Sequence, residues 1–143
     1  MPERTAHAVW RGGLRDGNGT VRTESGVLDS QYSFSTRFEN GAGTNPEELI
    51  GAAHAGCFSM ALSAALEKAG FKAQSVETTA RVTFEKAGEG FAITRIDLDT
   101  RAVVPGIDEA KFLEHAEKAK ATCPVSKALA SVPITLVASL VEG

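Results

Sequence analysis

Two cysteines in very different settings are the residues of this chain best suited to do chemistry. Cys57 lies inside an apolar stretch that is predicted to be helical, and Cys123 lies in a break between helical stretches, directly before Pro124. A thiolate is a nucleophile that can be oxidised reversibly. A buried helical thiol with a second thiol at a loop–helix junction therefore suggests redox chemistry that involves both thiols. Two thiols are too few for a disulfide scaffold.

Each cysteine also has a purely structural interpretation. Burial in an apolar helix raises the pKa of a thiol, so Cys57 is inert unless a cation lies nearby, and a small core residue is the commoner case. Cys123 is predicted to sit at a helix N-terminus, where the helix dipole favours a thiolate. Its context, Cys-Pro-Val-Ser, also resembles a one-cysteine thiol-exchange motif of the glutaredoxin type. A buried cysteine beside a helix cap explains this segment equally well.

Glu47 and Arg37 are a second pair of candidate functional residues. Two glutamates follow Pro46, and only Glu48 is placed to complete a capping box with Asn45, which leaves Glu47 for another partner. Arg37 lies ten residues upstream, and a bidentate pair with Glu47 would aim its guanidinium at an anion. The plain alternatives are a glutamate that favours the helix dipole and an exposed strand arginine.

The spacing of Glu47 and Cys57 predicts a dimer. Ten helical positions separate them by roughly 15 Å, so they cannot touch within one chain unless the helix breaks. Two copies of the helix that cross antiparallel near Ala52 would bring Glu47 of one chain beside Cys57 of the other. We therefore expect a two-fold dimer whose sites use both chains. The residues small enough for such an approach are Gly51, Ala52, Ala55 and Gly56.

Other kinds of site find little support. The three histidines, His7, His54 and His115, do not cluster with the cysteines at metal-ligand spacing, so no metal is expected. His54 lies three residues before Cys57 and could touch it, but a polar residue tolerated on the helix is the simpler interpretation. No glycine-rich phosphate loop follows a predicted strand.

Length and charge favour one ordinary globular domain over residues 1–143. Apolar residues make up 43% of the chain and the net charge is −3, which gives no basic surface for nucleic acid or anionic lipid. The N-terminus lacks the apolar core of a signal peptide, so a cytoplasmic protein is expected. The apolar stretch 49–66 contains a histidine and many small residues and follows two glutamates, which indicates a core helix rather than a membrane span.

The elements that position these residues are predicted to follow the order βββ-α-ββ-α-α-β, an α+β domain with antiparallel sheets. In the third strand, aromatic residues alternate with small polar ones up to Arg37. Asn45 as N-cap, Pro46 at the first position and Gly70 as the stop delimit a long helix that is apolar nearly all round and so should be buried. A helix that starts at Asp108 should face inward with Ala110, Leu113 and Ala116, and Phe112 is a further candidate for that face. The expected strands are 6–11, 20–24, 31–38, 75–85, 91–104 and 133–141, and the other helices are 46–69 and 124–130.

Five segments resemble the OsmC/Ohr family, and the resemblance is nearest to its osmotically inducible protein C branch. They extend over nearly the whole chain and include Gly-Thr-Asn-Pro-Glu-Glu-Leu-Ile-Gly-Ala-Ala-His-Ala, Cys-Phe-Ser-Met-Ala-Leu and Ala-Thr-Cys-Pro-Val-Ser. The segments are 23–28, 34–39, 43–55, 57–62 and 121–126.

The resemblance implies a thiol-dependent peroxidase, an oxidoreductase that reduces organic hydroperoxides as an intertwined homodimer in oxidative and osmotic stress defence. It assigns Cys57 as the peroxidatic cysteine, Cys123 as the resolving cysteine and Arg37 with Glu47 as the arginine–glutamate pair. In the organic hydroperoxide resistance branch the arginine comes from the first hairpin region, which makes Arg15 the alternative to Arg37. The implied reductant is a thiol such as a dihydrolipoyl group, with no cofactor and no metal.

The implied mechanism is a two-cysteine cycle. Arg37 stabilises the Cys57 thiolate, the thiolate attacks the distal peroxide oxygen, and Cys123 resolves the resulting sulfenic acid as a disulfide. The alternative from another class is a non-catalytic dimeric stress protein that binds an apolar ligand. A further alternative is a glutaredoxin-like exchanger that uses Cys123 alone.

Overall fold

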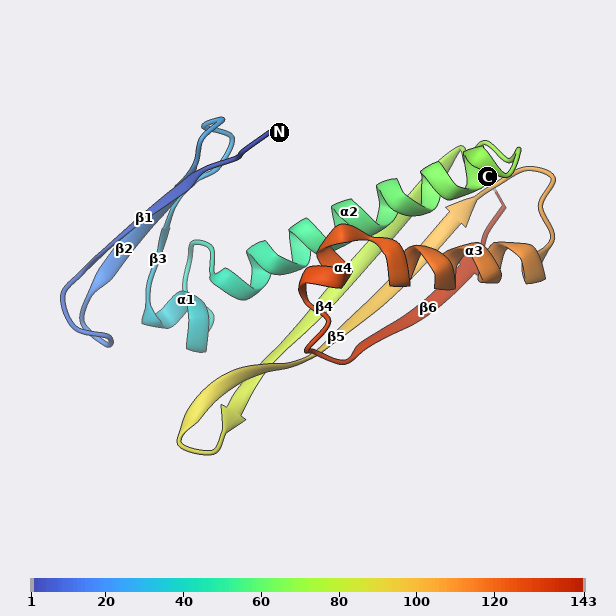
Figure 1. Cartoon of the computed structure of the whole chain (residues 1–143). Helices are drawn as coiled ribbons and strands as arrows, with labels where there is room; N and C mark the ends of the chain where they lie inside the picture. The colour runs from blue at the N-terminus through green and yellow to red at the C-terminus, as the bar shows by residue number, and fades with distance from the viewer. Residues whose placement is uncertain (1, 143) are drawn as a thin grey trace. The chain divides into compact units, whose positions relative to one another are not determined.

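The computed structural model describes residues 2–142, and its elements are labelled in Figure 1. Contacts divide the chain into two compact units, Met1–Leu49 and Ile50–Gly143, and each is described by itself. The expectation of a single domain is not tested by this division and stays a prediction. The order of elements agrees with the predicted order except for one additional short helix.

The first unit contains a three-stranded antiparallel sheet in the order β1-β2-β3. Its strands are β1 (Ala6–Arg11), β2 (Asn18–Thr23) and β3 (Asp29–Tyr32). Gly19 on β2 lies where an added Cβ would come within 2.8 Å of the rings of Trp10 and Tyr32. Those two rings pack across the sheet with centroids 5.3 Å apart. Glycine at this position therefore makes room for the aromatic pair.

The prediction of a strand over 31–38 was wrong in its second half. The strand ends at Tyr32, and a short helix, α1 (Phe34–Phe38), follows. Ser33 caps this helix, because its Oγ accepts the N–H of Thr36 while Thr36 Oγ1 accepts the N–H of Ser33. Aromatic residues four apart also suit a helix, and the rings of Phe34 and Phe38 stack with centroids 4.6 Å apart. Arg37 therefore lies on a helical turn rather than on a strand face.

The Ser33 cap should contribute measurably to stability. Ser33→Ala removes the side-chain half of the capping box, and we expect the free energy of unfolding to fall by about 1 kcal/mol. Chemical denaturation of both proteins measures the difference. Ser63→Ala, at an exposed position of the long central helix, is the matched control and should cause no loss, since alanine favours helix. An equal loss in both variants would contradict the role of the cap.

The long helix α2 (Pro46–Lys68) begins where the sequence predicted and ends one residue early. Asn45 Oδ1 accepts the N–H of Glu48 at 2.7 Å, as an N-cap does. The Glu48 carboxylate accepts a hydrogen bond from Thr44 Oγ1 instead of from the Asn45 backbone. The predicted capping box is therefore only half formed. Gly70, with a φ of +95°, terminates the helix in a conformation that favours glycine.

The second unit contains a sheet in the order β4-β5-β6, formed by β4 (Ser75–Ala87), β5 (Gly90–Val103) and β6 (Ile134–Leu140). β4 and β5 form the predicted antiparallel hairpin. β6 runs parallel to β5, which corrects the prediction that the sheets are antiparallel throughout. The chain passes through α3 (Glu109–Thr122) and α4 (Pro124–Ala128) between these strands. A helical crossover of this kind returns the chain to the same end of the sheet, as parallel pairing requires.

Alternate residues of β5 build the core of the second unit. Ile96, Leu98, Thr100 and Ala102 are buried, while their neighbours in the strand are more exposed. The helices α2 and α3 cover this face of the sheet (Figure 1). Their core side chains are Phe58, Leu62, Leu66, Phe112, Ala116 and Ala119.

The predicted inward face of α3 was partly wrong. Asp108 is its N-cap, because Asp108 Oδ1 accepts the N–H of Lys111 at 2.8 Å. Ala116 and Phe112 are buried, as predicted, but Leu113 and Ala110 are exposed. The face of α3 that carries the large ring of Phe112 is therefore the one that faces the sheet.

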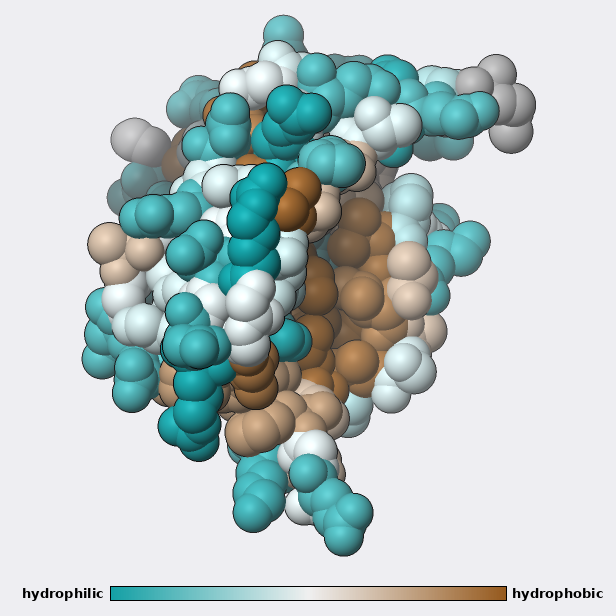
Figure 2. All heavy atoms as spheres, turned by 90° about the vertical axis from the view of Figure 1, so that its left-hand side faces the viewer, coloured by the Kyte–Doolittle hydropathy of each residue, from teal (hydrophilic) through white to brown (hydrophobic). Residues whose placement is uncertain are grey.

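The helix α2 is covered on one side only within this chain. Its buried stripe has the spacing of one helical face, His54, Phe58, Leu62 and Leu66. Ala52 and Gly56 are exposed on another face, and Met60 is 76% exposed. The expectation of a helix buried all round therefore does not hold for the single chain. Figure 2 shows hydrophobic residues, in brown, left at the surface.

By length and composition, α2 is the one helix within residues 2–142 that could cross a membrane. A single helix of this kind is weak support for a membrane protein, because the core helix of a globular unit has the same composition. The stripe that packs against β5 is typical of such a core helix.

Candidate active site

The structure brings the two cysteines together although 66 residues separate them in sequence. Cys57 lies on α2, and Cys123 is the residue between α3 and α4. Both thiols are free, and their sulfur atoms lie 2.9 Å apart in hydrogen-bonding contact. A disulfide bond is about 0.9 Å shorter than this separation. The pair is therefore placed to form a disulfide after a small movement.

The two thiols differ in their access to solvent. Cys57 is partly exposed, whereas Cys123 is fully buried. A solute that approaches this pair can therefore reach Cys57 but not Cys123. Exposure alone assigns Cys57 as the thiol that can be attacked from outside and Cys123 as its internal partner.

The pKa values of the two thiols move in opposite directions. Burial raises the pKa of Cys57, and the hydrogen bond with Cys123 raises it further. Burial would also raise the pKa of Cys123, but hydrogen bonds from Cys57, from the backbone and hydroxyl of Ser126 and from the backbone of Val125 lower it overall. In the reduced pair the negative charge therefore favours Cys123, and Cys57 needs an additional cation to become the nucleophile.

Separate removal of each cysteine should reveal this coupling as two opposite shifts. In Cys123→Ala, Cys57 loses a partner that raises its pKa, so the midpoint of its alkylation by iodoacetamide should move to lower pH. In Cys57→Ala, Cys123 loses a hydrogen-bond partner that lowers its pKa, so its midpoint should move to higher pH. Mass spectrometry across pH measures both, with wild-type protein as reference. Shifts of the same sign would contradict the coupling.

The sequence analysis did not identify the contact between His54 and Ser126. His54, fully buried on α2, has its Nε2 2.7 Å from Ser126 Oγ on α4. Burial lowers the pKa of His54, so the imidazole is neutral at neutral pH. The other ring nitrogen, Nδ1, is buried without a hydrogen-bond partner among the described residues. Both residues lie three positions from a cysteine, which is the one signal that the sequence offered.

Arg37 and Glu47 form the ion pair that the sequence suggested. Arg37 Nε donates to Glu47 Oε1 at 3.2 Å and Arg37 Nη2 donates to Oε2 at 3.1 Å, a bidentate geometry. Glu47 is buried, and the Arg37 side chain is partly exposed. A buried carboxylate of this kind fixes the direction of the guanidinium. This pair belongs to the first unit, and the cysteines belong to the second.

Arg15, the predicted alternative to Arg37, lies in the same unit with its guanidinium 4.8 Å from the centroid of the Phe34 ring. A cavity of about 200 Å³ adjoins Arg37. Its lining is mostly aromatic and apolar, and consists of Trp10, Leu14, Tyr32, Ser33, Phe34, Arg37 and Phe38. The first unit therefore combines a positive charge with an apolar pocket.

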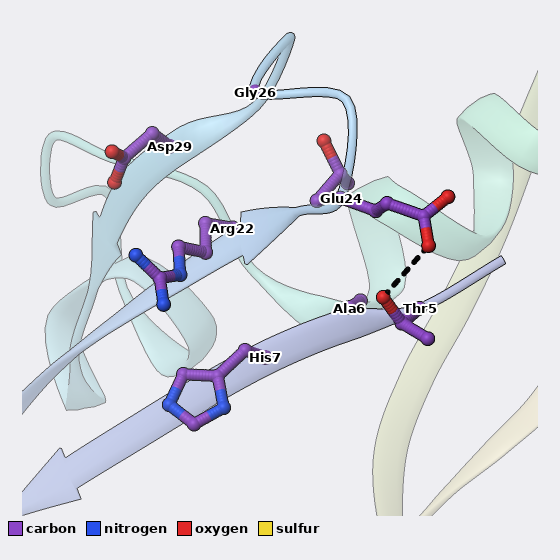
Figure 3. A pocket seen from close by; sticks show the side chains of 8 residues that line it. Thr5, Ala6, His7, Arg22, Glu24, Gly26 and Asp29 are labelled. Atoms are coloured by element: carbon purple, nitrogen blue, oxygen red, sulfur yellow. Dashed lines mark hydrogen bonds between the residues drawn. The ribbon is translucent and has the colours of Figure 1, made fainter.

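A second pocket of the first unit is polar and contains neither cysteine (Figure 3). Thr5 Oγ1 donates to the Glu24 carboxylate across it at 3.0 Å, and His7, Arg22 and Asp29 project along its walls. Within residues 2–142, no group of three histidine, cysteine or acidic side chains is placed to hold a metal ion. The expectation that the protein needs no metal or cofactor stays a prediction.

Known proteins share both the sequence pattern and the fold. The family model described as OsmC-like protein matches residues 39–137. Peroxiredoxin OsmC of Escherichia coli is 57% identical over 127 residues, which cover 88% of this chain and 89% of that protein. The organic hydroperoxide resistance protein of Xanthomonas axonopodis pv. citri is 32% identical, with 92% of each chain covered.

Among solved structures, the organic hydroperoxide resistance protein OhrB of Bacillus subtilis is similar, with a TM-score of 0.74 and 28% identity. The match covers 94% of this chain and 97% of that protein. An OsmC-like protein of Vibrio cholerae at 17% identity, with a TM-score of 0.76, shows the same fold.

Proposed function

This chain belongs to the OsmC-like protein family, and from that premise we propose that it is a thiol-dependent peroxidase that reduces organic hydroperoxides to alcohols. The observation that carries the proposal is the contact of a partly exposed thiol with a fully buried one at 2.9 Å. A passive core cysteine needs no second thiol at this distance. The names of relatives, peroxiredoxin and organic hydroperoxide resistance protein, support the same chemistry.

In the first step, the Cys57 thiolate attacks the distal oxygen of the hydroperoxide. The oxygen–oxygen bond breaks, Cys57 becomes a sulfenic acid, and the alkoxide takes up a proton and leaves as an alcohol. In the second step, the Cys123 sulfur attacks the sulfenic sulfur, a disulfide forms, and the hydroxide leaves as water after it gains the thiol proton. Rapid closure of this disulfide would protect Cys57 from further oxidation.

We propose that the guanidinium of Arg37 is the cation that Cys57 needs to become a thiolate. The bidentate contact with buried Glu47 would hold the guanidinium where it stabilises the thiolate and the charge that develops on the peroxide oxygens. The aromatic cavity beside Arg37 suits the apolar part of an organic hydroperoxide better than hydrogen peroxide. The substrate class that fits is therefore an alkyl or aryl hydroperoxide.

We further propose a homodimer in which Glu47 and Arg37 of one chain act beside the partner's Cys57. Support comes from the face of α2 that its own chain leaves exposed, with Ala52, Gly56 and Met60 at a spacing of four. An added Cβ at Gly56 would meet open space, which leaves room for a second helix. Gly51 does not belong to the dimer contact that the sequence predicted, because it is buried against Val82 of its own unit. A strict monomer at micromolar concentration would contradict this assembly.

The cycle leaves a Cys57–Cys123 disulfide that thiols must reduce. A dihydrolipoyl group, free or on a lipoylated protein, is the proposed reductant. The proposed location is the cytoplasm, with a part in oxidative and osmotic stress defence and with no cofactor, nucleic acid or membrane needed for the reaction.

The test treats the reduced protein with one equivalent of cumene hydroperoxide and analyses the intact mass and a peptide map. Loss of two hydrogen atoms with a linked peptide that contains Cys57 and Cys123 is the expected result. Unmodified thiols would contradict the peroxidase and favour a non-catalytic dimer that binds an apolar ligand. The same treatment of denatured protein is the control, since its cysteines are no longer placed together.

A further inference from the structure

A groove of about 380 Å³ lies between α2 and α3 in the second unit. A space of this volume suits a small ligand. Ala64 and Ala65 of α2 give the groove an apolar lining, and Thr122 lines it at the C-terminal end of α3. The cavity that suits a hydroperoxide lies beside Arg37 in the first unit, so this groove has no role in the cycle described above.

The ionisable side chains that line the groove are Lys68, His115 and Lys118, and no acidic side chain is among them. Within residues 2–142, neither lysine forms an ion pair. The chain as a whole has a net charge of −3, so the positive charge of the groove is a local feature. Two unpaired ammonium groups beside an apolar lining suit a ligand that combines an alkyl chain with a carboxylate.

The helix α3 lies along the C-terminal half of α2 and runs antiparallel to it (Figure 1). At one end of α3, Cys123 contacts Cys57 of α2. Near the other end, Lys111 Nζ lies 6.0 Å from the centroid of the Phe71 ring, which follows the end of α2. The groove between the two helices therefore extends from the end of α2 towards the pair of thiols.

The groove ends close to both thiols. Thr122 directly precedes Cys123 in the chain. Ala64 follows Cys57 by seven positions, which places both on one face of α2 about 10.5 Å apart along its axis. Lys118 precedes Cys123 by five positions, or about 7.5 Å along α3, and its flexible side chain adds reach. A ligand can therefore place one end at the thiols and the other at the lysines.

We propose that this groove binds the thiol that reduces the Cys57–Cys123 disulfide, with the alkyl chain on the alanines and a carboxylate between Lys68 and Lys118. The inference rests on the proposed peroxidase function and names the binding site and the charge of its second substrate. The reductant is the substrate that fits, because it must reach the disulfide after the hydroperoxide has left as an alcohol. The groove ends beside that disulfide.

The lysines hold the reductant and take no part in the bond changes. A thiolate of the reductant attacks the accessible sulfur of Cys57, a mixed disulfide forms, and Cys123 leaves as a thiolate. The second thiol of the reductant then attacks the reductant sulfur of the mixed disulfide, which releases Cys57 and closes a disulfide in the reductant. The reductant loses two electrons, and its two thiol protons end on the two cysteines.

The test compares dihydrolipoate with dihydrolipoamide, which have the same dithiol and alkyl chain but differ in a carboxylate against a neutral amide. The full chain is first oxidised to the disulfide with diamide and freed of oxidant. Acid quenching and mass spectrometry then give the second-order rate constant for its reduction by each reductant. The variants are Lys68→Gln, Lys118→Gln and the double variant. Lys111→Gln is the matched control, an exposed lysine of α3 that does not line the groove.

We expect the wild-type protein to react faster with dihydrolipoate, although its net negative charge alone would favour the neutral amide. The ratio of the two rate constants should fall about threefold in each single variant and about tenfold in the double variant, as for the loss of one and two partly exposed ion pairs. Lys111→Gln should keep the wild-type ratio. Added salt should lower the ratio in the wild-type protein, because it screens the lysines.

Two results would overturn the inference. A wild-type protein that does not prefer dihydrolipoate, or a double variant that keeps the wild-type ratio, would show that the groove does not recognise the carboxylate. An equal fall in Lys111→Gln would show attraction by charge in general and not by this groove. Failure of cumene hydroperoxide to form the disulfide, with normal reduction of the disulfide made by diamide, would contradict the proposed function and not the groove.

Discussion

Replacement of Cys57 by serine is expected to lower the rate of cumene hydroperoxide reduction by at least about a thousandfold, because a serine hydroxyl does not ionise at neutral pH and cannot be oxidised to a sulfenic acid. Solvent reaches Cys57 but not Cys123, so Cys123 cannot replace Cys57 as the thiol that meets the hydroperoxide. The loss of hydroperoxide in the presence of a dithiol measures the effect.

Cys123→Ser is the control for this prediction. It should retain the first oxidation of Cys57 but stop after about one equivalent or continue to over-oxidation, because the sulfenic acid is no longer resolved within the chain. The opposite pattern, activity in Cys57→Ser and none in Cys123→Ser, would contradict the cycle. It would favour thiol exchange by Cys123 alone.

Replacement of Arg37 is the second large expected effect. Arg37→Met should lower the rate of Cys57 oxidation by about a hundredfold to a thousandfold, the usual loss when a donor to developing negative charge is removed. Arg37→Lys should recover only part of the rate, since lysine keeps the charge but cannot form the two parallel bonds to Glu47. Stopped-flow oxidation of the reduced protein measures the first step directly.

Arg15→Met is the matched control, because Arg15 is another arginine of the first unit that contacts an aromatic ring. Its loss should change the oxidation rate far less than the loss of Arg37. A large effect at Arg15 with a small one at Arg37 would contradict our assignment. The catalytic guanidinium would then come from the hairpin region, as the alternative from the sequence analysis holds.

Features that depend on neighbouring residues could be predicted from the sequence. The start of α2 at Pro46 after the Asn45 cap, the β4–β5 hairpin and the start of α3 after Asp108 were all identified from local signals. Caps and turns consist of hydrogen bonds between residues a few positions apart, so the chain itself contains their partners. The pairing of Arg37 with Glu47 could also be predicted, because the two residues lie only ten positions apart in sequence.

One local feature was missed because two patterns compete. Aromatic residues at alternate positions predicted a strand through Arg37, while the Ser33–Thr36 capping box favours a helix over the same residues. The capping box gives the backbone N–H groups of Ser33 and Thr36 hydrogen-bond partners. The rings of Phe34 and Phe38 still stack, at a spacing of four residues that suits a helix. The cap therefore decides the structure of this segment.

The sequence by itself determined the candidates for the chemistry, two thiols, one arginine and one glutamate, but it placed Arg37 on a strand rather than on α1. Only the tertiary structure decided that Cys57 and Cys123 lie 2.9 Å apart, that β6 runs parallel to β5, and that His54 reaches Ser126 across 72 positions. The physical reason is that these contacts arise when α2, α3 and α4 pack on a common sheet. The burial and the contact with the other thiol that shift the pKa values of the two cysteines come from this packing and from no local pattern of residues.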